Sequence, residues 1–430
     1  MKIVVHGQGL AALVTAASLA GGGHDVALVC ADESVAGDLR ASRLPFDEPG
    51  LTAALAQAVS TGRLAIVAAL PVLKGRVAVH FLALQPDEQA LAAARLAAIA
   101  AFDSDLLLVN QVNFSVGATD ALHAQLLAQR RGGDGRTAAA SLPDFLRRGS
   151  ALANFRRPDR VIIGTEDPWA EGLLREILRP FTDDDVAVHV MPAKDAEFTK
   201  QAVNGMLATR LSYMNDMANV ADGLGIDIEN VRLGVGSDER IGSHFLHPGC
   251  GFGGTGFYQD LLSLKQTLDA SGVASKLVDT ALAVNEEQKE LLFRKLWRHY
   301  RGELAGRTVA VWGVAFKPDT DRVDHAPALR VIAALLAQGV TVRAHDPKAL
   351  AQLRAHIGAW PQLIECTDPW DAVAGTDALL VLTEWQDYRA PDFDRVRELM
   401  RTPLLLDGRN IYDPHTVRAH GIAYYGVGRR

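Results

Sequence analysis

The start of the chain constrains its fold more than any other segment. Residues 2–6 form a β-branched run typical of a buried parallel strand, which leads into a Gly-x-Gly-x-x-Ala motif at 7–12 and an Ala/Leu-rich helical pattern over 11–20. A Gly-Gly-Gly turn at 21–23 then precedes a second strand pattern over 25–30. This order predicts a β-α-β unit, whose two strands are parallel because a helix connects them.

Similar alternation continues along the chain and predicts two sheets. In the first half, strand patterns occur at 77–84, 106–110 and 160–163, with helical patterns between them. In the last third, the expected elements are a strand at 307–313, a helix at 327–338, and strands at 340–344, 378–382 and 403–406. Both parts therefore resemble doubly wound parallel sheets, which bind ligands at the carboxyl ends of their strands.

A long helical pattern separates the two sheets. It begins near residue 195 and places Lys200 and Asn204 four residues apart, so they are neighbours on one helix face. A second helical stretch is expected over 260–300. We expect an α/β protein with two Rossmann-like doubly wound domains joined by a central helical region. The predicted domains are an N-terminal α/β domain, a central helical region and a C-terminal α/β domain at 1–195, 196–300 and 301–430.

Composition excludes several classes of protein. The chain has 430 residues, 48% of them hydrophobic, and a net charge of -7, so neither disorder nor a polyanionic partner is favoured. No apolar run reaches the length of a membrane span. The three cysteines are far apart, which indicates no disulfide framework and suggests a reducing cytoplasm. We expect no metal site, because His244 and His247 lack a third ligand nearby.

The glycine motif predicts a dinucleotide site, with a merely structural turn as the alternative. Gly7, Gly9, Leu10 and Ala12 would let backbone N–H groups and a helix N-terminus face a pyrophosphate. An acidic residue that binds the adenosine ribose is expected at the end of the second strand. That position holds Cys30, and Asp32 follows two residues later.

Several longer segments are distributed along nearly the whole chain. They are GHDVALV, LPFDEPGL, FLRRGSALANFRRPDRVIIG, TKQAVNGMLATRLSYMND, DERIGSHFLHPGCGFGGTGFYQD, WGVAFKPDTD, LTEW and LLLDGRNIYDP. Taken together and in this order, these segments resemble the UDP-glucose/GDP-mannose dehydrogenase family. Their agreement in this order is more specific than any single motif.

The resemblance implies a specific chemistry. Members of this family oxidise the C6 alcohol of a nucleotide sugar to a carboxylate in two hydride transfers to NAD. A cysteine captures the intermediate aldehyde, and the resulting thioester is hydrolysed, because a thiol is both a strong nucleophile and a good leaving group. The resemblance also implies a homodimer. Residues 1–195 would form the dinucleotide-binding domain, 196–300 the dimerisation region, and 301–430 the domain that binds a UDP-sugar or a similar nucleotide sugar.

The chain retains some of the family's catalytic positions and lacks others. Lys200 and Asn204 match a helix pair that stabilises an oxyanion, and Asp260 matches an aspartate that handles protons and water. Asp144 stands at the position of a loop glutamate. Gly256, however, occupies the position of the nucleophilic cysteine, and glycine has no side chain that could form a thioester.

Cofactor positions are also changed, whereas sugar-binding positions are retained. The resemblance implies an NAD site formed by the glycine turn, Asp32 and Asn113, although Cys30 replaces the ribose-binding aspartate. Near the catalytic position, Gln259 replaces the lysine that follows the family's nucleophile. Persistent cations suit a diphosphate. The expected substrate-binding residues are Arg240, Phe252, Gly253, Phe257, Lys317 and Arg409.

Three functions therefore remain open from the sequence. The first is an NAD-linked UDP-hexose oxidoreductase, for which full oxidation to the acid is in question. The second is a non-catalytic nucleotide-sugar-binding or regulatory relative. The third is a hydroxyacid-type dehydrogenase. Cys250 is the candidate for a displaced thiol, but it lies six residues before Gly256. Glu48 either organises a turn or lies on the sugar side.

Overall fold

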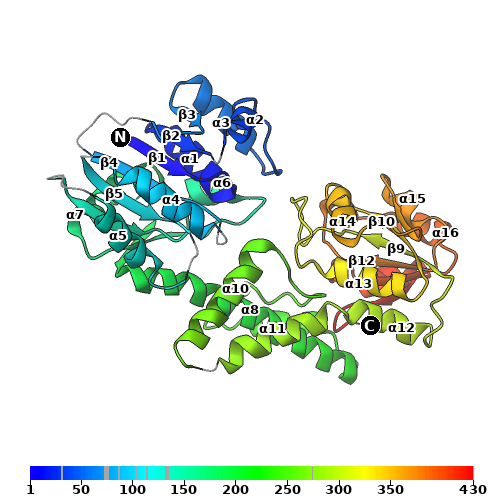
Figure 1. Ribbon diagram of the computed structural model, residues 1–430. Coiled ribbons are helices and arrows are strands. Elements are labelled where there is room, and N and C mark those ends of the chain that lie inside the picture. The colour runs from blue at the N-terminus through cyan, green and yellow to red at the C-terminus, as the bar shows by residue number, and fades with distance from the viewer. Residues whose placement is uncertain are drawn as a thin grey trace. The chain divides into compact units, whose positions relative to one another are not determined.

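The computed structural model contains two compact units, Met1–Val203 and Asn204–Arg430. It describes residues 1–30, 32–71, 77–85, 88–102, 104–112, 115–130, 135–183, 185–273 and 275–429 (Figure 1). The boundary between the units falls within the helical region expected at 196–300. The division into three domains stays a prediction.

The first unit is built on an eight-stranded sheet, in the order β3-β2-β1-β4-β5-β6-β7-β8. Pairing is parallel except between β6 and β7, where Ser141 faces Gly164 in antiparallel register. The expected doubly wound parallel sheet is therefore confirmed, apart from this one junction in its interior. The strands are β1 (Lys2–His6), β2 (Asp25–Val29), β3 (Leu64–Val67), β4 (Val77–Leu82), β5 (Asp105–Asn110), β6 (Thr137–Ser141), β7 (Arg160–Gly164) and β8 (Ala187–Met191).

Helices cover both faces of this sheet and leave its carboxyl edge open to ligands. One apolar core lies between the sheet and α1 and α3, and another lies between the sheet and α4 and α5. The helices are α1 (Leu10–Gly21), α2 (Glu33–Arg40), α3 (Leu51–Ser60), α4 (Gln89–Ile99), α5 (Ala118–Gln129), α6 (Ala151–Arg156) and α7 (Pro168–Leu178), followed by a 3-10 turn at Arg179–Phe181.

The central helices begin with α8 (Ala193–Leu224), which is 32 residues long. The helical stretch expected over 260–300 is three helices, and it starts earlier than expected, at Thr255. Gly272 has a φ of +75° and ends the first of them, since a left-handed residue cannot continue a helix. The helices that follow α8 are α9 (Ile228–Gly236), α10 (Thr255–Ala270), α11 (Lys276–Gln288) and α12 (Leu291–His299).

The second sheet has six strands, all paired in parallel, in the order β11-β10-β9-β12-β13-β14. It confirms the expected second doubly wound sheet. Its strands are β9 (Thr308–Trp312), β10 (Thr341–His345), β11 (Leu363–Glu365), β12 (Ala378–Val381), β13 (Leu404–Asp407) and β14 (Ala423–Tyr425). Its helices are α13 (Pro327–Ala337), α14 (Leu350–Ile357), α15 (Pro369–Val373), α16 (Phe393–Leu399) and α17 (Pro414–Ala419), with a 3-10 turn at Gln386–Tyr388.

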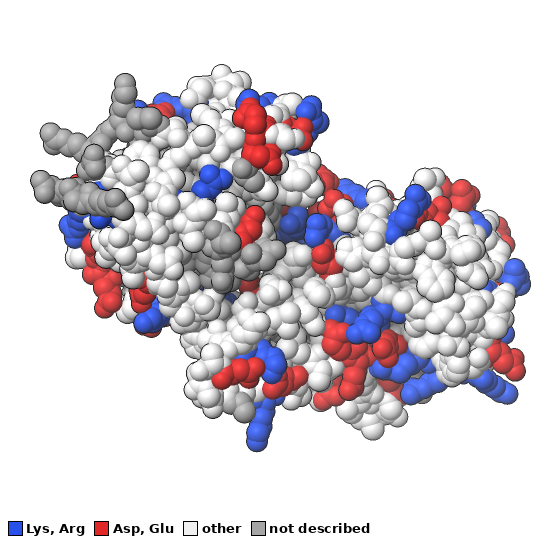
Figure 2. Space-filling model, in the orientation of Figure 1, with Lys and Arg blue, Asp and Glu red and all other residues white. Residues whose placement is uncertain are grey.

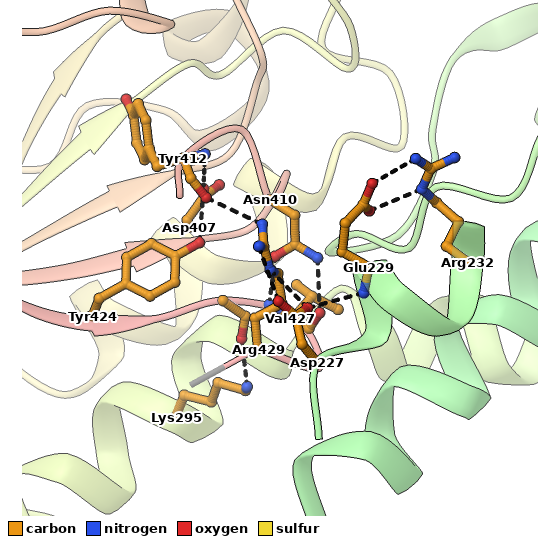
Figure 3. A network of polar contacts seen from close by, with 11 residues as sticks. Asp227, Glu229, Arg232, Lys295, Asp407, Asn410, Tyr412, Tyr424, Val427 and Arg429 are labelled. Carbon is orange, nitrogen blue, oxygen red and sulfur yellow. Dashed lines mark hydrogen bonds and ion pairs between the residues drawn. The ribbon is translucent and has the colours of Figure 1, made fainter. Parts of the chain in front are cut away.

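A polar network fixes the end of the chain within the second unit (Figure 3). Arg429 bonds to both carboxylate oxygens of Asp227, at 2.9 and 3.0 Å, and Asp227 also caps α9. The Asn410 side chain donates to the carbonyl of Val427 and accepts from its N–H, both at 2.8 Å. These contacts hold the C-terminal segment against α9 and the turn after β13.

The surface carries both signs of charge. On the face shown in Figure 2, basic and acidic side chains are interspersed, as expected for a chain with 44 basic and 51 acidic residues. Among the described residues, no helix combines the length and the hydropathy needed to cross a membrane.

Two buried histidines lie directly below the glycine turn. His6 on β1 and His80 on β4 are fully buried, and His6 Nε2 lies 3.0 Å from His80 Nδ1. Burial lowers the pKa of His80 to about 3 and holds the pKa of His6 well below its ordinary value. His6 Nδ1 and His80 Nε2 have no hydrogen-bond partner. Both imidazoles are therefore neutral in the folded protein.

This pair predicts acid sensitivity. Because both folded pKa values lie below the unfolded value of about 6.5, the unfolded chain binds more protons, and stability falls as pH drops below that value. We expect the free energy of unfolding to fall by about 2 to 4 kcal/mol between pH 7 and pH 5. Urea unfolding at both pH values measures this, with a His6→Val/His80→Ile variant as the control. Equal pH dependence in the two proteins would contradict the assignment.

Candidate functional site

The turn between β1 and α1 forms a cradle of backbone. Gly7 has a φ of +135°, and a Cβ at this residue would lie 2.3 Å from the carbonyl oxygen of Ala83 and 3.0 Å from the Cβ of Ala12. Gly9 is the N-cap of α1 and has no side chain to occupy the N–H groups of the first turn, where Leu10 is the first helical residue. Backbone N–H groups at a helix N-terminus suit the pyrophosphate of a dinucleotide, and the use of these residues to bind it stays a prediction from the motif.

The end of β2 lacks a carboxylate at the expected place. Cys30 is fully buried, its N–H donates to the carbonyl of Val67, and burial raises the pKa of its thiol to about 11. Asp32 is the N-cap of α2 and accepts a 2.9 Å bond from the N–H of Val35. The predicted cofactor residue Asn113 lies outside the described residues.

Arg95 on α4 is a residue of this site that sequence reasoning missed. Its Nη2 donates a 2.6 Å hydrogen bond to the carbonyl oxygen of Cys30. Arg95 is 65 residues further along the chain than Cys30. No pattern within β2 could have indicated it, because the contact depends on how α4 packs over the sheet.

Lys200 and Asp144 come together in the first unit. Lys200 is 6% exposed on α8, its ammonium donates to the carbonyl oxygen of Asp144, and it lies 3.6 Å from the Asp144 carboxylate. The same ammonium is 5.0 Å from the centre of the Phe145 ring. Two predicted catalytic residues are thus neighbours, and the Asp144 loop holds the Lys200 side chain.

Glu48 supports the segment that follows Asp144. It is 3% exposed and accepts hydrogen bonds from the N–H groups of Gly149 and Ala151, both at 2.7 Å. Its carboxylate thereby satisfies donors at the start of α6, where the Ser150 side chain makes no capping bond. Of the two roles left open for Glu48, the described contacts support the organisation of a turn.

Asn204 and Asp260 form a second pair, in the second unit. Asn204 Nδ2 donates a 2.5 Å bond to Asp260 Oδ2. Asp260 is buried within α10, whose N-cap is Gly254, so its carboxylate does not cap the helix. Lys200 and Asn204 lie one turn apart on α8, as predicted.

Position 256 offers space without a reactive group. Gly256 is the second residue of α10, and a Cβ built on it meets no atom within 4 Å. The chain has three cysteines, all of them buried, and burial raises the thiol pKa of Cys250 and Cys366 as well as that of Cys30. Cys250 Sγ faces the carbonyl of Leu382 at 3.9 Å. Burial therefore disfavours the thiolate form of Cys250, the candidate for a displaced nucleophile.

Arg409 joins three loops at the carboxyl edge of the second sheet. Its guanidinium donates to the carbonyl oxygens of Leu382 at 2.8 Å and Gly251 at 3.2 Å, and it lies 3.2 Å from the Glu384 carboxylate. It also reaches the carbonyl of Phe316, which precedes the half-buried Lys317. Arg409 thus positions the segments that carry several of the predicted substrate residues.

The loop before α10 is fixed by close contacts. The Asn285 side chain bonds to both the N–H and the carbonyl of Phe252, and the rings of Phe252 and Phe257 meet edge to face at 5.1 Å. At Gly253, a Cβ would lie 2.5 Å from the carbonyl oxygen of His325. Arg240, in contrast, is highly exposed and bonds to Asp238 within its own turn.

The fold and the glycine turn define a protein of the NAD-binding α/β class. Its residues 1–182, 194–287 and 310–414 match, respectively, the NAD binding, central and UDP binding domains of one family. The chain belongs to the UDP-glucose/GDP-mannose dehydrogenase family.

Similar proteins agree with this assignment over their full lengths. A UDP-glucose 6-dehydrogenase of Pseudomonas aeruginosa is 40% identical over 445 residues, covering 100% of this chain and 98% of its own. One from Rhizobium meliloti is 34% identical, with complete coverage of both chains. The solved UDP-glucose dehydrogenase of Pyrobaculum islandicum is 30% identical, with a TM-score of 0.88 over 100% of this chain and 98% of its own.

The contacts of Glu48 predict a large effect on stability. Replacing it with alanine leaves two backbone donors without their acceptor, and we expect the free energy of unfolding to fall by about 2 to 4 kcal/mol. Urea denaturation measures the change. The control is Glu171→Ala, which removes an exposed ion pair with Arg175 and should cost less than about 0.5 kcal/mol. Equal effects would show that Glu48 supports nothing beyond a surface contact.

Proposed function

We propose that the chain is a UDP-hexose oxidoreductase that uses NAD to convert the C6 alcohol to the aldehyde and does not carry the thiol-dependent oxidation further. The observation that carries this proposal is the glycine at position 256, together with three buried cysteines whose thiol pKa values are raised. The named relatives, UDP-glucose 6-dehydrogenases, make UDP-glucose the substrate to test first.

The first oxidation needs no thiol. The glycine turn would hold NAD, which would accept one hydride from C6, and the hydroxyl proton would pass to a base on the protein. The alcohol and NAD would thus give an aldehyde, NADH and a proton. The Asp260 carboxylate is the proposed acceptor of that proton, through water, and the Asn204 amide orients it. The ammonium of Lys200 would stabilise charge developing on the C6 oxygen.

The second oxidation by the family route requires a nucleophile. Without a side chain at position 256, neither a thiohemiacetal nor a thioester can form there. Loss of a covalent nucleophile costs on the order of a million-fold in rate, equivalent to about 8 kcal/mol of barrier. This loss is large enough for the aldehyde, hydrated in water, to become the main product.

The nucleotide-sugar site is the part that we propose to be retained. Arg409 is held among the Gly251, Phe316 and Leu382 segments, and the Phe252 loop is fixed by Asn285. Together with Lys317 and Phe257, these residues supply cations and aromatic surface for a nucleoside diphosphate. Arg240 is proposed to bind the same ligand, although its described contacts stay local.

We also propose that the protein is a homodimer that uses an exposed face of α8. Met206, Tyr213 and Val220 are spaced by seven residues and are 63%, 54% and 49% exposed. Residues at this spacing form one apolar stripe along a helix. A second copy presents the same stripe, so a symmetric pair buries both.

Restoring the nucleophile should restore the second oxidation. Because a Cβ at position 256 meets no atom and the N-terminus of α10 lowers a thiol pKa, we expect Gly256→Cys to raise UDP-glucuronate formation at least about 100-fold. Product analysis by mass spectrometry, with a hydroxylamine to trap aldehyde, measures this. Gly234→Cys, which adds a thiol at an open position on α9, is the control.

The outcome of this experiment separates the functions. Aldehyde from the unmodified protein and acid from Gly256→Cys support the proposal. Abundant acid from the unmodified protein contradicts it. Binding of UDP-glucose with no product from either protein identifies a non-catalytic binding protein instead.

The dimer proposal predicts a charge-sensitive interface. In light scattering after size exclusion, the unmodified protein should have about twice its chain mass of 46.2 kDa. Met206→Glu/Tyr213→Glu should shift it to the monomer, since burying two carboxylates is costly. Ala355→Glu on α14 is the control. The use of this stripe would be refuted if the unmodified protein were a monomer. It would also be refuted if the Met206→Glu/Tyr213→Glu protein stayed a dimer, as the control should.

A further inference from the structure

The adenosine end of the dinucleotide site has lost the group that selects against a 2′-phosphate. In dinucleotide folds a carboxylate at the end of the second strand bonds to the ribose 2′-hydroxyl and repels a phosphate there. This position holds Cys30, a neutral and fully buried residue at the end of β2. Nothing at position 30 therefore favours the unphosphorylated ribose.

A cation stands at the same edge. Arg95 extends from α4 and donates to the carbonyl of Cys30 at 2.6 Å. Its Nε is buried without a partner, and no carboxylate of the described residues lies within 4 Å of its guanidinium. An arginine stays charged in proteins and presents several donors to a phosphate. Arg95 thus brings a positive charge, offset only in part by Glu88, to the carboxyl end of β2.

The nearby carboxylates have other partners. Glu33 is paired with Arg40, Asp32 accepts from the N–H of Val35 at the start of α2, and Glu88 accepts from the N–H of Gln85 at 2.7 Å. The helix N-terminus offsets part of the charge of Asp32. Because Asp32 is a cap, its carboxylate is committed to α2.

We propose that Arg95 is a specificity-determining residue that lets this site accept a 2′-phosphate, so that NADPH binds at least as tightly as NADH. The inference rests on the proposed dinucleotide function and adds the phosphorylated cofactor to it. A site with aspartate at position 30 would bind NADH more tightly than NADPH. The function of Arg95 is to bind cofactor, and it takes no part in the chemistry at C6.

Calorimetric titration of the full chain with NADH and with NADPH tests the proposal without relying on turnover. We expect a dissociation constant for NADPH equal to or below that for NADH. Arg95→Gln should weaken NADPH about 10- to 100-fold and NADH less than about 3-fold, as loss of one charged phosphate contact predicts. Arg95→Lys should keep most of the NADPH affinity because it keeps the charge.

Two further variants make the test specific. Arg63→Gln removes the same charge at the amino end of β2, where Arg63 pairs with Asp25, and should change neither affinity. Cys30→Asp should lower NADPH affinity and raise NADH affinity. Titration with UDP-glucose confirms that each variant is folded.

Each outcome bears on a definite claim. NADH binding with NADPH at least 10-fold weaker in the unmodified protein, or equal losses for both dinucleotides in Arg95→Gln, overturns the role of Arg95 and leaves the proposed function intact. Binding of UDP-glucose with neither dinucleotide overturns the proposed oxidoreductase function, and this inference with it.

Discussion

Close packing around the glycine turn is the constraint on which the dinucleotide site depends. At Gly7 the backbone approaches Ala83 so closely that no side chain can be accommodated, and this approach brings β1, β4 and the start of α1 together. The helices that cover both faces of the sheet leave its carboxyl edge for ligands. Cys30, Arg95 and the buried histidines all matter because they lie at or just below that edge.

A second glycine has the opposite effect. At Gly256 the absence of a side chain leaves open space rather than relieving a close contact. Polar groups of the neighbouring segments are hydrogen-bonded, since Asn204 bonds to Asp260 and Asn285 bonds to Phe252. We therefore propose a supported polar site without a nucleophile at position 256, which is the pattern expected if binding and the first oxidation persist while the covalent step does not.

Local patterns predicted much of the fold. The β1-α1-β2 unit and the neighbouring Lys200 and Asn204 follow from spacing alone, and the structure confirms them. The antiparallel pairing of β6 and β7 could not be predicted, because a buried strand has the same composition in either direction. The start of α10 was missed because Gly254 gives no side-chain capping signal. Contacts made by Glu48 and Arg95 depend on tertiary packing across 65 or more residues.

The account depends most on the claim that no sulfur of this chain attacks the aldehyde. Intact-protein mass spectrometry tests it most directly, on samples quenched with acid during incubation with UDP-glucose and NAD. The account predicts the unmodified chain mass at every time point. A chain that gains the mass of a covalently bound nucleotide sugar, mapped to Cys30, Cys250 or Cys366, would contradict it.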